Sequence, residues 1–244
     1  MQPVARLTLR ALAGVSFSVE RGEAVALIGE NGAGKSTLLR VLATLIVPSR
    51  GQAEIFGCDV VSNGAGARKQ LGYYTSGDEG FYARLTGREN LRLFATMNNL
   101  MRRQALRRID ELAELLGMQD ILDRQSRTYS TGMLQRLGLA RSLLHAPAVL
   151  LLDEPTRSLD PLAAAEFRRF LKNDIVGRLG TTLLFASHTL GEVEEMASRV
   201  VLLAEGRILA FDIPRNLCAQ TGAVHLQGAL ERLAGPVSST QRKR

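Results

Sequence analysis

The first segment that could do chemistry is a glycine-rich stretch from Gly29 to Thr37, which reads GENGAGKST. Its spacing, Gly-x-x-x-x-Gly-Lys-Ser/Thr, suits a phosphate chain because residues without side chains let backbone N–H groups come close to an anion. Lys35 is expected to reach the β- and γ-phosphates, and Ser36 to ligate Mg²⁺. The sequence predicts a nucleoside triphosphate site formed by Gly29, Asn31, Gly32, Gly34, Lys35, Ser36 and Thr37.

Two adjacent acids form the second candidate group. Asp153 and Glu154 directly follow the apolar run 148–152, which predicts a parallel strand buried on both faces. Carboxylates placed side by side near a low-dielectric core repel each other unless a cation is present. We expect Asp153 to organise Mg²⁺ and its waters, and Glu154 to polarise an attacking water.

A third strand is expected to end at the same place. The β-branched and apolar run 181–186 is followed by Ser187 and His188. The carboxyl ends of parallel strands meet at one edge of a sheet, so His188 should lie near Lys35 and Glu154. A contact between His188 and the γ-phosphate is the expected role.

A helix start lies upstream of the acids, in the sequence YSTGM at 129–133. Ser130 can cap the helix that continues to about Leu144, and Gly132 lets a second phosphate approach the backbone closely. Alone this pattern is weak, since Ser-Thr-Gly before a helix is often only a cap. Its position shortly before the strand that ends in Asp153 gives it weight.

The elements that position these residues predict an α/β fold: a P-loop NTPase core with a mostly parallel sheet. The phosphate loop joins a strand at 25–28 to a helix at about 35–46. Other expected elements are a small antiparallel β subdomain from about 1–25 and 53–60, an inserted helical subdomain, a helix at 162–172 started by Asp160-Pro161, and a hairpin at 200–203 and 207–211.

Four segments now occur in one order and spacing: GENGAGKST, YSTGMLQRL, VLLLDEPTRSLD and the strand end at His188. Together they resemble the nucleotide-binding subunit of an ATP-binding cassette (ABC) transporter, over about residues 12–215. The form Ser-Thr-Gly-Met, in place of Ser-Gly-Gly-Gln, is similar to subunits that drive exporters of the ABC-2 type. The resemblance implies one ABC ATPase domain over 1–228, with a core at about 12–87 and 146–215 and a helical insert at about 88–145. The mixture of Gly, Ser, Pro and charge at 229–244 indicates a loosely ordered tail.

The resemblance also assigns roles. It makes Ser130 to Met133 the signature, Asp153 the Mg²⁺-organising acid, Glu154 the catalytic base and His188 the switch histidine, while the segment 158–160 crosses between two subunits. In the family, one chain's phosphate loop holds ATP and a second chain's signature helix closes over it. A homodimer or heterodimer of ATPase subunits that powers a separate transmembrane permease is therefore implied, peripheral to the membrane on its cytoplasmic face.

Two positions depart from the family pattern. A glutamine that contacts Mg²⁺ and water is usual between the phosphate loop and the signature, and Ser76 stands at that place, with Asp78 close by. Either side chain could replace the amide, and a slow or tightly gated ATPase is equally compatible. The usual aromatic that stacks on adenine is missing from 4–8, where Arg6 is either a stacking group or an ordinary solvated side chain.

A hinge segment at 81–86 joins the core to the helical insert and begins with two aromatics, Phe81 and Tyr82. In the resemblance this hinge forms the groove that receives a short cytoplasmic helix of the permease. Aromatics are favoured at interface centres, so both rings are candidates for docking. The alternative is that they fill the core beneath the loop.

Composition agrees with a single ATPase domain. The chain has 244 residues with 45% apolar content, which is enough to bury a substantial core. It contains no run of 18 apolar residues, its start is too polar for a secretory signal, and Cys58 and Cys218 have no metal or disulfide spacing. These features indicate a cytoplasmic protein that does not itself span a membrane.

The net charge of +7 comes from arginine clusters at 102–103, 107–108 and 168–169 and from the tail at 241–244. The first two clusters lie on a predicted amphipathic helix, about 101–116, with Ala105, Ile109, Leu112 and Leu116 on its apolar side. A solvated face is the default interpretation, and proximity to anionic lipid comes second. Nucleic acid ranks third as a partner because no aromatics are interleaved for base stacking.

The sequence therefore predicts an ATPase subunit that powers transport, with export favoured. Two alternatives stay open: a soluble ABC-type ATPase that acts on ribosomes or DNA, and a nucleotide-binding regulatory module with weak hydrolysis. The first usually has two cassettes or long coiled coils, and this chain shows no internal repeat. The second is motivated by the missing glutamine and opposed by the intact Lys35, Ser36, Asp153, Glu154 and His188.

Overall fold

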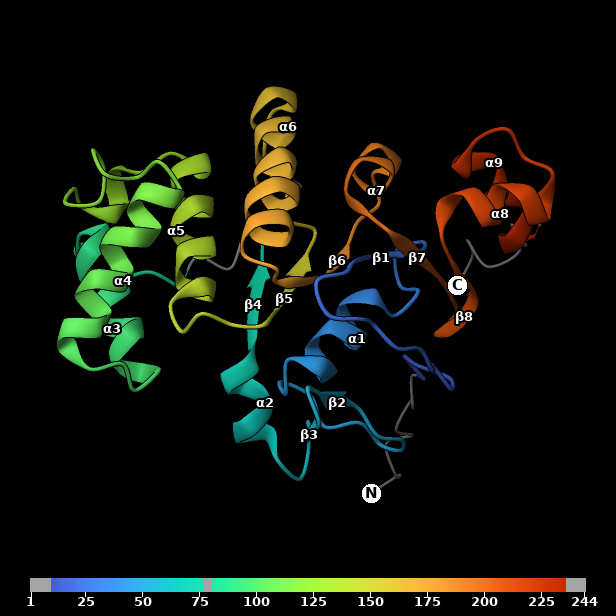
Figure 1. Ribbon diagram of the computed structural model, residues 1–244, viewed down its shortest axis with the longest axis horizontal. Coiled ribbons are helices and arrows are strands. Elements are labelled where there is room, and N and C mark those ends of the chain that lie inside the picture. The colour runs from blue at the N-terminus through green and yellow to red at the C-terminus, as the bar shows by residue number, and fades with distance from the viewer. Residues whose placement is uncertain (1–9, 77–79, 236–244) are drawn as a thin grey trace, which may run out of the picture.

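The structure is a computed structural model that describes residues 10–76 and 80–235. A six-stranded sheet in the order β4-β5-β6-β1-β7-β8 forms its centre (Figure 1). Neighbouring strands are parallel except β7 and β8, which form the predicted antiparallel hairpin. The prediction of an α/β fold with a mostly parallel sheet is thus confirmed. The strands are β1 (Ala24–Ile28), β4 (Leu71–Thr75), β5 (Val149–Asp153), β6 (Thr182–Ala186), β7 (Arg199–Ala204) and β8 (Arg207–Asp212).

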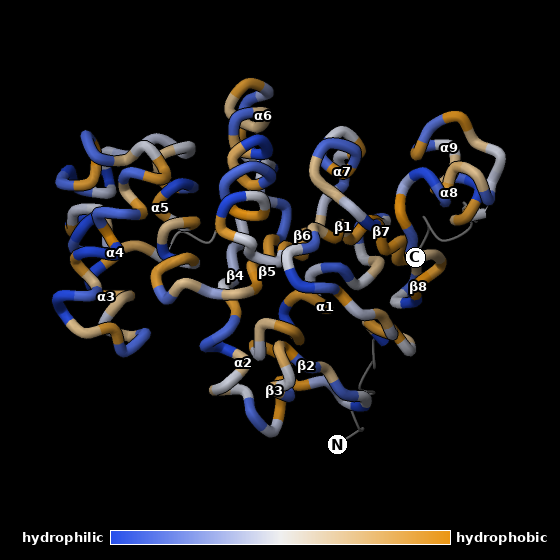
Figure 2. The backbone as a smooth tube through the Cα atoms, viewed as in Figure 1, coloured by the Kyte–Doolittle hydropathy of each residue, from blue (hydrophilic) through white to orange (hydrophobic). Residues whose placement is uncertain are grey.

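Both faces of this sheet are buried, because successive side chains of a strand point to opposite faces. On one face Leu150, Leu152 and Phe185 pack against the helices of the insert and against later helices. On the other face Leu27 and Leu151 pack against the helix after the phosphate loop. Figure 2 shows apolar residues concentrated in the central strands and polar residues along the outer helices.

Three helices, α3 (Gly87–Met97), α4 (Arg102–Leu115) and α5 (Thr131–Leu143), are grouped on one side of the sheet (Figure 1). They correspond to the predicted helical insert. Thr86 begins α3 with a capping box, since its side chain accepts from the Glu89 N–H and the Glu89 carboxylate accepts from the Thr86 N–H. The apolar side predicted for α4 is buried as expected, at Ala105, Ile109, Leu112 and Leu116.

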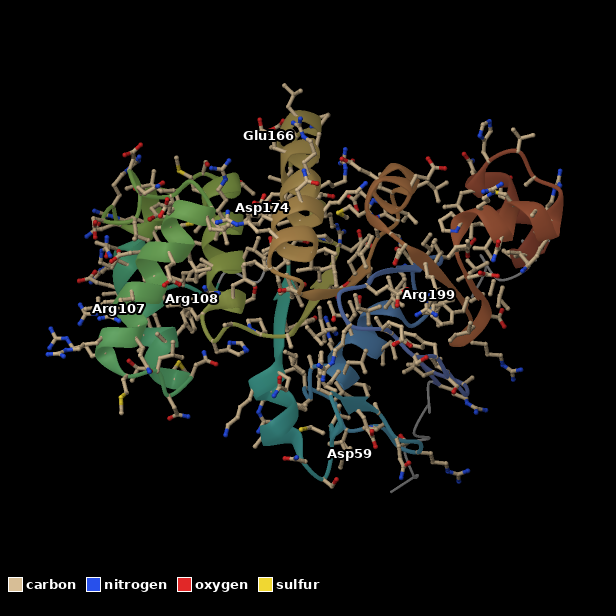
Figure 3. The ribbon with its side chains drawn as sticks, viewed as in Figure 1. Asp59, Arg107, Arg108, Glu166, Asp174 and Arg199 are labelled. Carbon is tan, nitrogen blue, oxygen red and sulfur yellow. The ribbon has the colours of Figure 1, made fainter. Side chains whose placement is uncertain are left out.

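The arginines of α4 do not form one uniform face. Arg107 is exposed, whereas Arg108 donates to the Leu143 carbonyl at 3.0 and 3.3 Å and pairs with Glu111 (Figure 3). Arg168 likewise pairs with Glu195 at 2.6 Å. Part of the positive charge therefore stabilises contacts between elements.

The antiparallel subdomain is smaller than we predicted. It consists of β2 (Glu54–Ile55) and β3 (Cys58–Asp59), followed by α2 (Gly64–Gln70). Residues 10–23 contain no strand, so this part of the prediction is wrong, and residues 1–9 lie outside the described part. The apolar alternation of Val15, Phe17 and Val19 arises because these side chains pack on the core, without a hydrogen-bonded partner strand in the described residues.

The remaining helices also correct the predicted boundaries. Helix α1 (Lys35–Leu42) ends before the expected Ile46, and α6 (Pro161–Phe170) continues into a π-helical stretch, Leu171–Arg178. Shorter elements are a 3₁₀ turn at Ser126–Thr128, α7 (Leu190–Met196) and α8 (Pro214–Thr221).

The tail prediction is wrong in its first part. Residues 229–234, which were predicted to be loose, belong to helix α9 (Leu226–Ala234), and residues 236–244 lie outside the described part. The helix forms because Leu226, Ala229 and Leu230 share one face and are buried. No helix among the described residues is long and apolar enough to span a membrane.

Candidate functional site

The phosphate loop connects β1 to α1, as the sequence predicts. Gly29 and Gly34 have φ angles of 157° and 107°. A Cβ on Gly29 would lie 2.1 Å from the Leu203 carbonyl oxygen, and one on Gly34 would lie 2.6 Å from the Ala11 oxygen. Only glycine fits either position. A Cβ on Gly32 would meet no protein atom within 4 Å, so the loop is open to a ligand there.

Lys35 lies inside this loop with only 7% of its surface exposed. Its Nζ donates to the carbonyl oxygens of Gly29 at 2.6 Å and Glu30 at 3.1 Å. Burial lowers the pKa of the Lys35 ammonium, and the carboxylates of Glu154 and Asp153 oppose this change. A buried cation whose hydrogen-bond partners in the described residues are neutral carbonyls fits an anionic ligand such as a phosphate chain.

Ser36 of the phosphate loop and Asp153 at the end of β5 lie in direct contact. The Ser36 hydroxyl donates to Oδ1 of Asp153 at 3.0 Å, and Asp153 is buried at the last position of β5. Mg²⁺ prefers one or two protein oxygens together with phosphate and water oxygens. Ser36 and Asp153 provide such a pair beside the phosphate loop, so these residues fit Mg²⁺.

Two loop residues predicted to contact phosphate occupy different surroundings. Asn31 is exposed, and Thr37 is half-buried in the first turn of α1. The orphan N–H groups of this turn follow Gly34, and their partial positive charge favours an anion. Because α1 begins directly after the loop, its N-terminus faces the phosphate loop, as the sequence predicts.

Glu154 has an unusual backbone conformation that the sequence did not reveal. Its φ angle of 54° lies in the left-handed region, which bulky residues rarely adopt. The Glu154 N–H donates to the Ala186 carbonyl at 3.1 Å, just beyond the register pair Asp153 and Ala186. Strained residues are concentrated at functional sites, so this conformation supports a functional role for Glu154.

His188 contacts Glu154 directly. The ring Nδ1 of His188 is hydrogen-bonded to Oε2 of Glu154, and the histidine side chain is 58% exposed, whereas the Glu154 side chain is 16% exposed. The structure thus brings together the ends of β1, β5 and β6, as predicted from the strand order. The immediate partner of His188 is the acid, a contact that we did not predict.

The signature segment lies beside the segment that was predicted to cross between subunits. Ser130 caps α5, since its hydroxyl accepts from the Met133 N–H at 3.3 Å. A cavity of about 880 Å³ is lined by 130–133, 158–160 and Gln135, among others. Gln135 is buried, and both polar atoms of its side chain have no hydrogen-bond partner in the described residues. Sequence reasoning missed Gln135, because its type alone suggests an ordinary helix surface.

Ser76 lies next to the acids, whereas Asp78 falls outside the described residues. The Ser76 N–H donates to the Asp153 carbonyl at 3.3 Å, immediately after the pairing of β4 with β5. This backbone contact places Ser76 beside the end of β5, and its role as a substitute for the missing glutamine stays a prediction. Arg6, the other departure, also lies outside the described residues.

We expect Ser76→Ala to slow ATP turnover about 2- to 10-fold, the effect of one lost hydrogen bond, and to weaken ATP binding less. Steady-state hydrolysis and equilibrium binding of a fluorescent ATP analogue measure the two effects. Ser49→Ala, at an exposed serine, serves as the control. Normal turnover in Ser76→Ala would mean that other groups replace the glutamine.

The hinge aromatics differ from each other. The Phe81 ring packs edge-to-face on Phe94 with centroids 5.8 Å apart, and the Arg141 guanidinium lies 5.1 Å from both centroids. Tyr82 is 59% exposed. Phe81 therefore packs against α3 and the signature helix α5, and Tyr82 is the ring available at the surface.

Fold and site together define the class. A glycine loop between a strand and a helix, a buried lysine, a Ser–Asp pair and an acid at the end of the neighbouring strands form a P-loop nucleotide-binding site.

The comparisons with known proteins identify the family. Residues 12–157 match the family model described as ABC transporter. The chain is 37% identical over 201 residues to the ABC transporter ATP-binding protein NatA of Bacillus subtilis (strain 168), which covers 82% of this chain and 81% of NatA. It is 39% identical over 233 residues to the daunorubicin resistance ATP-binding protein DrrA3 of Streptomyces coeruleorubidus, which covers 94% of this chain and 72% of DrrA3.

A solved structure agrees with these relatives. The structure of an ATP binding subunit of an ABC transporter superposes with a TM-score of 0.81 at 30% identity, over 92% of this chain and 93% of the other. The chain belongs to the ABC transporter family, and it is an ATP-binding ATPase of that family.

Proposed function

We propose that this ATPase works as a dimer and powers export through a separate transmembrane permease at the inner face of the cell membrane. The observation that supports hydrolysis most directly is the contact of Glu154 with His188 at the sheet edge that holds Lys35. The name of DrrA3, a daunorubicin resistance protein, favours export as the direction of transport.

In the proposed reaction, Lys35 and the loop N–H groups hold the phosphate chain of ATP, and Ser36 and Asp153 hold Mg²⁺. The metal, when bound, neutralises charge on the β- and γ-phosphates. Glu154 polarises the water that attacks the γ-phosphorus and accepts its proton, while the bond from that phosphorus to the bridging oxygen breaks and ADP leaves. His188 orients the Glu154 carboxylate through its hydrogen bond.

Dimerisation is proposed because the signature residues Ser130 and Gly132 would complete the site of a second chain. Each chain would supply a phosphate loop to one ATP and a signature to the other. The cavity lined by 130–133 and 158–160 supports this arrangement, because it brings the signature beside the segment that is proposed to cross between the two subunits.

The permease contact is proposed at the hinge. Tyr82→Ala is expected to weaken assembly with the permease by roughly 1–3 kcal/mol, the loss of one docked aromatic, and to leave the melting temperature unchanged. Phe81→Ala is the matched comparison and should lower the melting temperature, because its ring packs on Phe94. Circular dichroism melts measure stability.

Assembly is measured by capture of the tagged chain from detergent-solubilised membranes of its own cells, with the bound multi-span protein quantified by mass spectrometry. Capture of no multi-span membrane protein by the wild-type chain would refute the transport proposal. Equal capture by wild type and Tyr82→Ala would place the docking groove elsewhere.

A further inference from the structure

A buried glutamate connects the two loops that hold Glu154 and His188. Glu192, on helix α7, is only 3% exposed. Its Oε2 accepts a hydrogen bond from the Ser187 hydroxyl at 2.6 Å, and its Oε1 accepts one from the Thr156 hydroxyl. Thr156 follows Glu154 by two residues, and Ser187 immediately precedes His188.

The Glu192 bridge links the two loops at a point where backbone hydrogen bonds between β5 and β6 have ended. The ladder between β5 and β6 ends with the bond from the Glu154 N–H to the Ala186 carbonyl. Beyond that bond the two loops follow separate paths, one toward α6 and one toward α7. The side chain of Glu192 joins them again, at Thr156, which follows Glu154, and at Ser187, which directly precedes His188.

The surroundings of Glu192 disfavour the charged form of its carboxylate. Burial raises the pKa of Glu192, and the negative charge of Glu154 acts in the same direction. The Ser187 hydroxyl, Arg168 of α6 and His188 oppose the change. Arg168 is itself paired with Glu195, so within the described residues the direct hydrogen-bond partners of the Glu192 carboxylate are two neutral hydroxyls. An apolar residue would avoid this desolvation penalty, so the glutamate is expected to have a specific role.

We propose that Glu192 is a positioning residue for ATP hydrolysis, which fixes Thr156 and Ser187 and thereby holds the Glu154 carboxylate against the His188 ring. The inference rests on the proposed roles of Glu154 and His188. It also accounts for the left-handed backbone of Glu154, since a residue held in that region needs support from both sides. Glu192 acts through its neighbours and does not contact the nucleotide.

The test compares three variants of the full chain in steady-state hydrolysis and in binding of a fluorescent ATP analogue. Glu192→Ala removes both contacts and should lower kcat on the order of 10- to 100-fold, because small misplacements of catalytic groups have effects of this size. The Kd for the analogue should stay within about threefold, since the phosphate loop is not involved. Glu194→Ala, at an exposed position of the same helix, should match wild type.

The variant Glu192→Gln shows whether Glu192 acts by positioning its neighbours or through its negative charge. Glu192→Gln keeps the shape, and its amide can accept from one hydroxyl and donate to the oxygen of the other. It should therefore recover most of the lost kcat. A kcat in Glu192→Ala equal to wild type, or a loss of kcat matched by an equal loss of ATP binding, would overturn the inference.

Two hydroxyl variants keep the inference testable if Glu192→Ala does not fold. Thr156→Val and Ser187→Ala each remove one donor to the carboxylate, and each should lower kcat several-fold, about the effect of one hydrogen bond. Wild-type turnover in both would overturn the inference. Glu154→Gln is measured in parallel: if it hydrolyses ATP normally, the proposed base is wrong, whereas if it is inactive and Glu192→Ala is normal, only the positioning role fails.

Discussion

Glu154→Gln should bind ATP and leave it uncleaved, with hydrolysis reduced about 10²- to 10⁴-fold. The amide keeps the shape of the carboxylate and can still contact His188, but it cannot accept a proton from water. In the proposed mechanism, dimer closure requires bound ATP and is reversed by hydrolysis, so this variant should accumulate as an ATP-bound dimer. Phosphate release and size-exclusion chromatography with Mg-ATP measure the two effects.

The control for this prediction is Glu54→Gln, which changes an exposed carboxylate on β2. It should hydrolyse ATP at the wild-type rate and elute as wild type does. Hydrolysis by Glu154→Gln at the wild-type rate would exclude Glu154 as the base. A monomer in the presence of Mg-ATP, with hydrolysis lost, would contradict the dimer and leave the base assignment intact.

The site residues that could be predicted from sequence stand at the ends of local patterns, such as apolar runs, that form parallel strands. Apolar runs define where β1, β5 and β6 end, and the carboxyl ends of neighbouring parallel strands meet at one edge. Lys35, Asp153 and His188 could therefore be brought together without coordinates. The cap at Ser130 and the helix start at Asp160 were also predictable, since each cap accepts from N–H groups only two or three positions away.

The parts that could not be predicted depend on contacts between distant residues or on backbone angles. The left-handed φ of Glu154 is imposed by the strand and loop around it, and nothing in the letters Asp-Glu-Pro-Thr indicates it. Glu192 stands in the acidic sequence Leu-Gly-Glu-Val-Glu-Glu-Met, which resembles a solvated helix face. Its burial arises only when Thr156, 36 residues upstream, is folded against it.

The wrong predictions at the two ends of the chain have a related cause. Alternating apolar residues at 15–19 satisfy the strand pattern, but a strand also needs a partner edge, and packing on the core alone produces the same alternation. Near the other end, the mixture of Gly, Pro and charge beyond residue 228 suggested a loose segment. The three apolar residues Leu226, Ala229 and Leu230 outweigh that composition, because their burial stabilises α9.

Lys35→Ala is expected to abolish useful ATP binding, with a Kd raised about 10- to 100-fold, since charge-assisted hydrogen bonds contribute about 1.5–3 kcal/mol each. The Lys35 ammonium is buried and is held above the loop carbonyls of Gly29 and Glu30, so its position is fixed before ATP arrives. Removal of the amine leaves the carbonyls without their donor and the phosphate without its cation. Equilibrium binding of a fluorescent ATP analogue measures the loss.

Lys35→Arg separates charge from shape in the same assay. It keeps the positive charge but replaces a compact ammonium by a planar guanidinium, which does not fit the two donor contacts at 2.6 and 3.1 Å. This variant should therefore bind ATP nearly as weakly as Lys35→Ala, whereas the control Lys69→Ala, at an exposed lysine of α2, should bind normally. ATP binding by Lys35→Ala at the wild-type Kd would show that the loop N–H groups hold the phosphates without the lysine. In that case the buried ammonium would serve the folding of the loop rather than the nucleotide, and the melting temperature of Lys35→Ala would fall.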